Sequence, residues 1–210
     1  MDDFETKGAG RSVGRAVRNR EEVFEEQSGL LAYLHDFAWL MAIVVIVFLF
    51  CFRIVIVSGP SMRDTLIDGD YLFLASKLFY HTPKQGDIIV ASKDDFRGGE
   101  PIVKRIIATE GQTVDIDFVR GIVYVDGVPL DEPYTLTPTN LQEGAFFPMT
   151  IEENCVFVMG DNRNASTDSR SVMLGAVKKD YIQGKAVFLL VPGKTPDTEK
   201  MDWSRFGFIN

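Results

Sequence analysis

The chain has 210 residues and a formal net charge of −8, from 22 Lys and Arg against 30 Asp and Glu. This length is typical of one domain, or of one domain with an appendage. The acidic balance disfavours a general nucleic-acid binder, which needs a basic surface. Two cysteines exclude a disulfide-rich scaffold and a four-cysteine zinc site. A Ser-His-Asp triad or a two-histidine metal site would have to use His35 and His81, the two histidines of the chain.

An almost uninterrupted apolar stretch lies in the first third of the chain. Residues 37–52 carry no charged or strongly polar side chain, and the apolar pattern resumes after Arg53 and continues to Val57. About 20 helical residues span the hydrocarbon core of a membrane, so residues 37–57 predict one transmembrane anchor, with Arg53 reaching the headgroups. A cleaved signal peptide is disfavoured because a long polar segment precedes the stretch and no small-residue cleavage site follows it.

The anchor divides the chain into three parts. Residues 1–36 form a polar N-terminal segment, residues 37–57 the anchor, and residues 58–210 a single domain of ordinary size. An excess of basic residues before the anchor favours a cytoplasmic N-terminus by the positive-inside rule. The count close to the membrane is nevertheless tied, because two arginines lie on each side: Arg18 and Arg20 before the anchor, Arg53 and Arg63 after it.

The pattern of residues 58–210 is typical of a mainly β domain. Short apolar stretches bounded by turn residues predict strands at 71–75, 87–91, 102–108, 113–118, 121–125, 155–159 and 186–191. The pair Asp126-Gly127, between VYV and VPL, is a strong signal for a two-residue hairpin turn. No long amphipathic helix follows the anchor. The pattern therefore predicts an antiparallel sandwich or coiled barrel-like sheet, without alternating strands and helices.

The first candidate for chemistry is the segment VSGPSM at residues 57–62, directly after the anchor. Ser61 follows a Gly-Pro pair, in which the backbone is conformationally special. Such a turn can present a hydroxyl outward and leave nearby N–H groups free for an oxyanion. Taken alone, the segment is also explained by a plain exit turn from the anchor.

The second candidate is the basic pair Lys104 and Arg105 inside the strand expected at 102–108. Because side chains alternate across a strand, the two point to opposite faces, and one of them should enter a buried or partly buried environment. Burial lowers the pKa of an ammonium group, so a lysine can serve as a base near neutral pH, whereas arginine stays protonated. An edge strand with two solvated charges is the alternative.

The third candidate is the polar segment GDNRNASTDSR at residues 160–170. Its small polar and charged residues cannot cover a core, so it forms either an exposed flexible loop or an ordered hydrogen-bonded network. Opposite charges occur two residues apart in Asp161/Arg163 and in Asp168/Arg170. The segment has neither the glycine run nor the lysine followed by Ser or Thr of a phosphate-binding loop.

These three segments together resemble the bacterial type I signal peptidases. SGPSM after an apolar span, then VKRIIATEGQTV, then GDNRNASTDSR follow that family's order and spacing. QGDIIVA at 85–91, VDGVPLDEPY at 125–134 and IQGKAV at 182–187 also fit. The resemblance covers about residues 37–191. It implies a membrane-anchored serine endopeptidase built on an antiparallel coiled sheet, with Ser61 as nucleophile and Lys104 as general base, and with neither metal nor cofactor.

The resemblance also implies roles for the surrounding residues. Ser166 matches the family serine that hydrogen-bonds the lysine amine, and Asp168 and Arg170 match a structural ion pair beside the site. We expect Asp161 and Arg163 to support the same loop. The substrate strand would lie between the segments that precede the two dyad residues, which gives three candidate pocket walls: Val57, Ile102 and Val103.

The substrates implied are secreted preproteins, cut after small residues at −1 and −3. The family places its catalytic domain on the outer face of the cell membrane, which settles the tied charge count in favour of a cytoplasmic N-terminus. The expected partners are therefore preproteins and the lipid bilayer, with proximity to the secretion translocon and no nucleic acid. A tether at the membrane raises the effective concentration of a substrate whose signal peptide lies in the bilayer.

The chain departs from the family's pattern near the expected site. Asp64 stands where many members have proline, Ala165 where they have a second asparagine, and Gly59 where some have a serine hydroxyl. A backbone N–H, best that of Ser61, would then have to supply the oxyanion donor. These departures bear on specificity and loop shape, because both dyad residues are present.

Two other functions remain open at this point. A self-cleaving repressor of the SOS type also uses serine and lysine, but it carries a DNA-binding head in place of the apolar span. A non-enzymatic anchored β domain would require Ser61 and Lys104 to lie far apart. The distance between Ser61 Oγ and Lys104 Nζ therefore separates an enzyme from a binding domain.

Overall fold

The computed structural model describes residues 29, 31–48 and 52–209, which belong to two compact units. The first unit contains a helix over Leu31–Phe48 that is long and apolar enough to cross a membrane, by length and composition. This helix fits the expected transmembrane anchor. Residues 1–28 and 30, most of the polar N-terminal segment, lie outside the described residues.

The bounds of the anchor differ from the predicted 37–57. The helix includes Leu31, and the last part of the predicted span is strand β1 (Phe52–Ile56), which pairs antiparallel with β2 (Tyr71–Ser76). Hydropathy alone cannot separate a helix from an apolar strand that adjoins it, because both are continuous runs of apolar residues. The β-branched FRIVI sequence fits a strand equally well.

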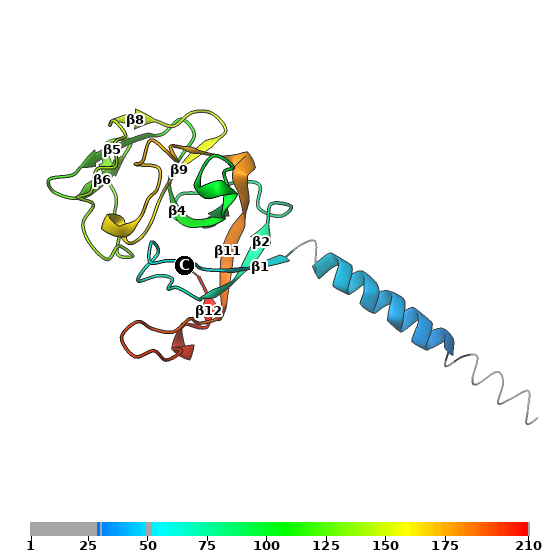
Figure 1. The fold of residues 1–210 in the computed structure, drawn as a ribbon. Coiled ribbons are helices and arrows are strands. Elements are labelled where there is room, and N and C mark those ends of the chain that lie inside the picture. The colour runs from blue at the N-terminus through cyan, green and yellow to red at the C-terminus, as the bar shows by residue number, and fades with distance from the viewer. Residues whose placement is uncertain (1–28, 30, 49–51, 210) are drawn as a thin grey trace, which may run out of the picture. The chain divides into compact units, whose positions relative to one another are not determined.

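The second unit is built on a curled antiparallel sheet (Figure 1). Its neighbouring strands are, in order, β1, β2, β11 (Ile182–Val191), β3 (Ile88–Ala91), β4 (Ile102–Thr109), β9 (Cys155–Met159) and β10 (Val177–Lys178), and β12 (Gly207–Phe208) pairs with β11. Register shifts interrupt β11 and the pairing of β4 with β9. Such bulges bend strands and increase their twist, which lets the sheet curl.

A smaller antiparallel sheet is formed by the part of the chain between β4 and β9. It consists of β7 (Val128–Pro129), β6 (Ile122–Val125), β5 (Thr113–Asp117) and β8 (Met149–Thr150). Asp126 and Gly127 both have positive φ, 53° and 79°, and connect β6 to β7, so the predicted two-residue hairpin is confirmed. Single 3-10 turns complete the described structure: η1 (Arg97–Gly99), η2 (Arg163–Ala165), η3 (Lys179–Tyr181) and η4 (Trp203–Arg205).

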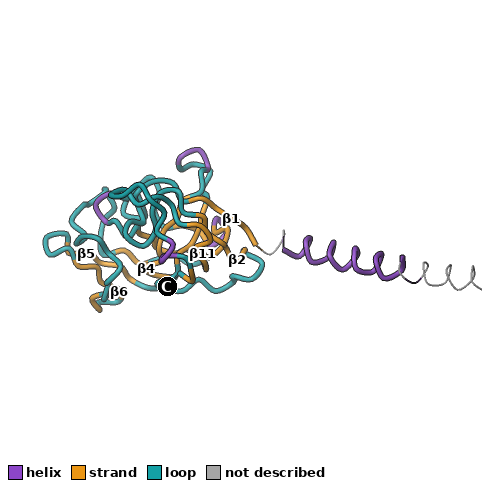
Figure 2. Tube along the Cα trace, turned by 90° about the horizontal axis from the view of Figure 1, so that it is seen from below, coloured by secondary structure: helices purple, strands orange, loops and turns teal. Residues whose placement is uncertain are grey.

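The mainly β fold is therefore confirmed, with long loops between the strands (Figure 2). Strand β4 lies inside the large sheet, between β3 and β9, and its residues enter all three hydrophobic core clusters. Val103 belongs to the first, Ile102 and Ile106 to the second, and Ile107 to the third. A residue anywhere along the middle of β4 is consequently inside the protein, whichever way its side chain points.

Candidate active site

Ser61 lies on a loop, residues 57–70, that leaves the sheet after β1 and returns to it before β2; we call it the nucleophile loop. Its two ends pair through Val57 N–H to Asp70 O (2.8 Å) and Gly69 N–H to Val57 O (2.9 Å). Met62 and Leu66 are fully buried in the first core cluster and fix the middle of the loop. Gly59 turns the chain with a φ of +88°, a conformation that favours glycine.

The structure brings Ser61 and Lys104 together, although they are 43 residues apart in sequence. Lys104 Nζ donates a hydrogen bond of 2.7 Å to Ser61 Oγ and a second, of 3.2 Å, to the carbonyl of Val103. Lys104 is only 4% exposed. The alternative of an edge strand with two solvated charges is wrong, because β4 is an inner strand and Arg105 is buried as well.

The environment of Lys104 lowers its pKa to about 8 from an ordinary 10.5. Burial is the main cause, because it removes water from the ammonium form, and the positive charge of Arg97 adds to the effect. The carboxylates of Asp168, Glu143 and Asp161 oppose the shift. Within the described part of the chain, Lys104 forms no ion pair. Half of the amine is therefore neutral near pH 8, far below the pH at which an ordinary lysine loses its proton.

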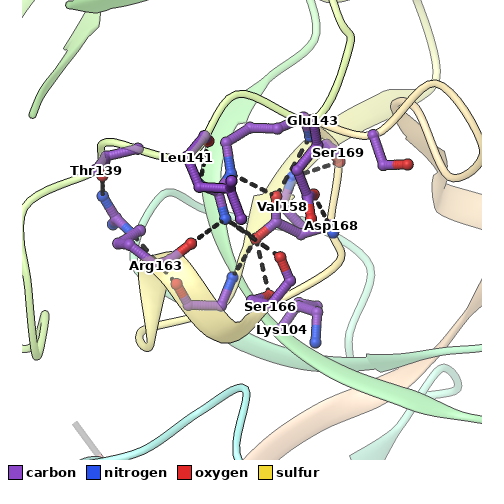
Figure 3. A network of polar contacts seen from close by, with 12 residues as sticks. Lys104, Thr139, Leu141, Glu143, Val158, Arg163, Ser166, Asp168 and Ser169 are labelled. Carbon is purple, nitrogen blue, oxygen red and sulfur yellow. Dashed lines mark hydrogen bonds and ion pairs between the residues drawn. The ribbon is translucent and has the colours of Figure 1, made fainter. Parts of the chain in front are cut away.

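The polar segment 160–170 is an ordered, buried network (Figure 3). Asp168 forms its centre: its carboxylate accepts hydrogen bonds from Arg170 Nε (2.8 Å), Ser166 Oγ (2.8 Å) and Gly160 N–H (3.0 Å). Arg170 also donates to the carbonyls of Leu141 and Arg163. Of the two possibilities for this segment, the ordered network is correct, and the flexible loop is wrong.

The second charge pair expected in the segment forms differently. Arg163 pairs with Glu132, not with Asp161, and also donates to Thr139 Oγ1 at 2.8 Å. The Asp161 carboxylate instead accepts two hydrogen bonds from the Arg105 guanidinium, from Nε at 2.9 Å and from Nη2 at 2.8 Å. A spacing of two residues would place both side chains on the same side of an extended backbone, but Arg163 begins the 3-10 turn η2, and each of the two charges finds its partner on another element.

Arg105 has three kinds of partner that together fix its position. Besides the Asp161 carboxylate, its guanidinium donates to Gly86 O at 2.9 Å and lies 4.0 Å from the ring centre of Tyr134. Asp161 also accepts a hydrogen bond from Thr65 Oγ1, a residue of the nucleophile loop. Arg105 therefore helps to hold the loop that carries the serine, a role that its sequence position did not reveal.

Ser166 lies beside the dyad but has a different partner from the one expected. Its hydroxyl donates to Asp168, and no hydrogen bond joins it to Lys104 among the described residues, although Figure 3 shows the two side chains next to each other. Gly160 separates this serine from the nucleophile: a Cβ at Gly160 would collide with Ser166 Oγ and with the carbonyl of Ser61. A supporting role of Ser166 toward the lysine stays a prediction.

Asn162 contacts the nucleophile turn directly, which sequence reasoning missed. Its N–H donates to Ser61 O at 3.0 Å, and its side-chain amide donates to Pro60 O at 3.1 Å. The N–H of Gly59 is occupied by Asp68 Oδ1 at 2.8 Å. The N–H of Ser61, by contrast, donates no hydrogen bond to another described residue, so it is available to an oxyanion.

The three candidate pocket walls are all buried, at 3% exposure for Val57, 7% for Ile102 and 8% for Val103. Val57 and Val103 share one core cluster, whereas Ile102 belongs to another. Their role as walls of a substrate pocket stays a prediction. In the part of the chain that the structure describes, no group of three or more His, Cys, Asp or Glu side chains could hold a metal ion.

Comparison with known proteins identifies the family. The family described as signal peptidase, peptidase S26, matches residues 30–191. A probable signal peptidase I-1 of Synechocystis sp. is 38% identical over 143 residues, 65% of this chain and 69% of the relative. Signal peptidase I P of Bacillus subtilis subsp. natto is 34% identical over 187 residues, 82% of this chain and 95% of the relative.

A solved signal peptidase I from Enterococcus faecalis is 29% identical, with a TM-score of 0.40, and covers 50% of this chain and 96% of that one. The family match and the two relatives at 34% and 38% identity define a class of hydrolases, the peptidases. Within that class the chain belongs to the signal peptidase I family, S26, which removes signal peptides. This membership decides against the self-cleaving repressor and the non-enzymatic domain.

Proposed function

We propose that the protein is a membrane-anchored serine endopeptidase that removes signal peptides from secreted preproteins by a Ser61/Lys104 dyad. One observation carries the proposal: the 2.7 Å hydrogen bond between Ser61 Oγ and a buried lysine amine whose pKa lies near 8. A general base must lie within hydrogen-bond reach of the proton that it removes and have a pKa close to the working pH. Lys104 meets both requirements.

The reaction follows from these positions. Neutral Lys104 Nζ takes the proton of Ser61 Oγ as the oxygen attacks the scissile carbonyl carbon, and the N–H of Ser61 stabilises the oxyanion. When the tetrahedral intermediate collapses, the C–N bond breaks, and the lysine ammonium gives its proton to the leaving amine. Water, deprotonated by the same lysine, then attacks the ester carbonyl carbon; the bond from that carbon to Ser61 Oγ breaks, the lysine returns the proton to Oγ, and the signal peptide leaves with a free carboxylate.

The polar network and the walls are assigned supporting parts. Asp168, Arg170 and Ser166 hold the loop beside the amine, Asp161 ties that loop to β4, and Arg163 ties it to the loop between β7 and β8. The small-residue requirement at −1 and −3 would come from shallow subsites at Val57, Ile102 and Val103. The three side chains are apolar and buried, which supports their assignment as walls of subsites that accept small residues.

The proposed location follows from the apolar helix. It would anchor the protein in the cell membrane once, with the N-terminus in the cytoplasm and the peptidase domain on the outer face, close to the translocon. There the domain meets the cleavage site where the signal peptide leaves the bilayer. No nucleic acid and no cofactor takes part in this reaction.

The test is cleavage of a preprotein, and of a peptide with alanine at −1 and −3, by the full chain in detergent. We expect Ser61→Ala to be folded and inactive, because no acyl-enzyme forms. Ser58→Ala is the matched control, since it removes an exposed hydroxyl three residues away and should stay active. Leucine at −1 of the peptide should abolish cleavage. Substantial activity of Ser61→Ala would remove Ser61 from the mechanism.

A further inference from the structure

The C-terminal segment returns to the nucleophile loop, which the 160–170 network also contacts. After β11 the chain continues through Gly193 and η4, and Ile209, the last described residue, packs against the first core cluster. Gly193 packs so closely on residues 68–70 that a Cβ there would overlap the Asp68 carbonyl. This segment lies outside residues 30–191, the part of the chain that matches the family.

The contact between the segment and the loop is centred on a buried carboxylate. Asp70 is fully buried, and its two oxygens accept four hydrogen bonds. Arg205 supplies two of them, from Nη1 at 2.9 Å and from Nη2 at 2.6 Å. The N–H groups of Gly193 (2.7 Å) and Ile67 (2.9 Å) supply the others. A buried charge held in this way is expensive to leave without its partner.

Arg205 contacts the nucleophile loop at two separate points. Besides Asp70, at the end of the loop, it donates from Nη2 to the carbonyl of Thr65 at 3.2 Å. The side-chain hydroxyl of the same Thr65 donates to Asp161. Thr65 is thus held through its backbone by the C-terminal segment and through its side chain by the Arg105–Asp161 pair. Thr65 is the third residue after Met62, which follows Ser61.

We infer that Arg205 is a positioning residue for the Ser61 nucleophile, acting through Asp70 and Thr65. The inference rests on the proposed Ser61/Lys104 mechanism. The dyad requires a precise hydrogen bond between a strand residue and a loop that has no regular secondary structure. A displacement of about 1 Å at such a centre can cost about 10²-fold in rate. The planar fork of an arginine can fix both oxygens of Asp70 and still reach Thr65, which a lysine ammonium cannot do.

The experiment measures kcat and KM of the full chain in detergent, for Arg205→Ala and Arg205→Lys. Lys194→Ala is the matched control, since it removes an exposed positive charge from the same segment. Circular dichroism is used to choose an assay temperature at which every variant is fully folded. We expect Arg205→Ala to lower kcat by about 10- to 100-fold with KM within about twofold, and Arg205→Lys to recover part of the loss. Lys194→Ala should equal the wild type.

The pH profile, measured at the temperature at which every variant is folded, shows whether the base itself is unchanged. Arg205→Ala should lower the alkaline plateau of kcat while the midpoint near pH 8 stays in place, because the burial of Lys104 does not depend on Arg205. A wild-type kcat in folded Arg205→Ala would overturn the inference. If that variant does not fold, a wild-type kcat in folded Arg205→Lys would overturn it equally.

A double variant tests the route through Asp70. If Arg205 acts through this carboxylate, Asp70→Asn/Arg205→Ala should have about the same kcat as the more impaired single variant. Fully additive losses would show independent effects and would contradict the inference. Ser61→Ala, measured in parallel, distinguishes a failure of the proposed mechanism from a failure of the positioning role. If Ser61→Ala stays active, the proposed function fails. If Ser61→Ala is inactive while Arg205→Ala is fully active, only the positioning role is refuted.

Discussion

Lys104 and Arg105 occupy neighbouring positions of β4, and both are buried, yet the protein treats their charges in opposite ways. The Arg105 guanidinium contacts a carboxylate, a carbonyl and an aromatic ring, and the carboxylate balances its positive charge. Among the described residues, the Lys104 amine donates hydrogen bonds only to uncharged groups, a serine hydroxyl and a backbone carbonyl, and its pKa falls to about 8. One cation is stabilised in its charged form, and the other is driven toward its neutral form.

This difference shows that burial alone does not make a base. Both side chains lose water, but of the two only Arg105 has an ion-pair partner in the described part of the chain, and the carboxylates near Lys104 do not outweigh the burial that lowers its pKa. The chemistry of the two positions also matches their residue types, because arginine stays protonated at any pH at which proteins fold, whereas lysine titrates. The first two predictions therefore exchange or remove the members of this pair.

The largest effect is expected from Lys104→Arg. If the neutral amine is the working form, arginine cannot supply it, and kcat/KM should fall by at least about 10²–10⁴-fold, nearly as far as in Lys104→Ala. Steady-state cleavage of one preprotein by wild type and both variants provides the measurement. An arginine variant within about tenfold of the wild type would mean that the charge, not the proton transfer, matters.

The second effect concerns stability. Arg105→Met leaves the buried carboxylate of Asp161 without its ion-pair partner, and removal of one member of a buried pair costs about 3–5 kcal/mol of unfolding free energy. Urea unfolding measures it. Arg120→Met, which removes an exposed arginine 3.8 Å from Asp117, is the control and should change the free energy by less than about 1 kcal/mol. Equal losses in both variants would contradict the structural role given to Arg105.

The third prediction is the pH dependence of the wild-type rate. Below the Lys104 pKa of about 8 the amine is mostly protonated, so kcat/KM should rise about tenfold for each pH unit and level off above pH 8. Peptide cleavage at constant ionic strength from pH 6 to 9.5, buffered in about half-unit steps, gives the profile. A rate that is constant from pH 6 to 9 would be incompatible with this lysine as the base.

The smallest effect is a gain of stability in Lys104→Met. A folded pKa of about 8 against 10.5 in the unfolded chain means that the unfolded state binds more protons between these values, so wild-type stability rises with pH there. Below pH 8 the full penalty applies, on the order of 3 kcal/mol before the loss of the hydrogen bond to Ser61 is subtracted. Methionine removes it, so the variant should be about 1–2 kcal/mol more stable at pH 7.

The gain should shrink as the pH rises from 8 toward 10.5, because the wild-type amine then loses its charge. Urea unfolding of both proteins at each pH isolates this contribution, since other titrating groups are common to both. Lys104→Met less stable than the wild type at neutral pH would show that the ammonium is not penalised in the fold.

Local patterns were enough to predict most of the large sheet. The stretches predicted at 71–75, 102–108 and 155–159 correspond to strands β2, β4 and β9. They could be predicted because apolar alternation and turn residues are local properties of the sequence. Strand β1 was assigned to the membrane, since its apolar sequence adjoins the helix without a turn signal. The two-residue strands β8, β10 and β12 carry too few residues to show any alternation.

The candidate site was predicted in its residues more than in its contacts. Ser61 and Lys104 are adjacent in space, as expected, but several partners of the surrounding charged residues come from segments that were not singled out as candidates for chemistry. Glu132 and Tyr134 lie in a stretch that was noticed only for its resemblance, and Arg205 lies beyond it. Such contacts depend on how the sheet curls, and a periodic pattern holds no information on that curvature.

Gly160 has a consequence for anyone who wishes to redesign this enzyme. Its hydrogen atoms fill the gap between the Ser61 carbonyl and Ser166 Oγ, so even the smallest side chain would push the two apart. A saturation library at this codon should therefore return glycine alone among active clones, whereas neighbouring exposed positions tolerate substitution. Directed evolution of new cleavage specificities has to begin elsewhere, since the site has no spare room at its narrowest point.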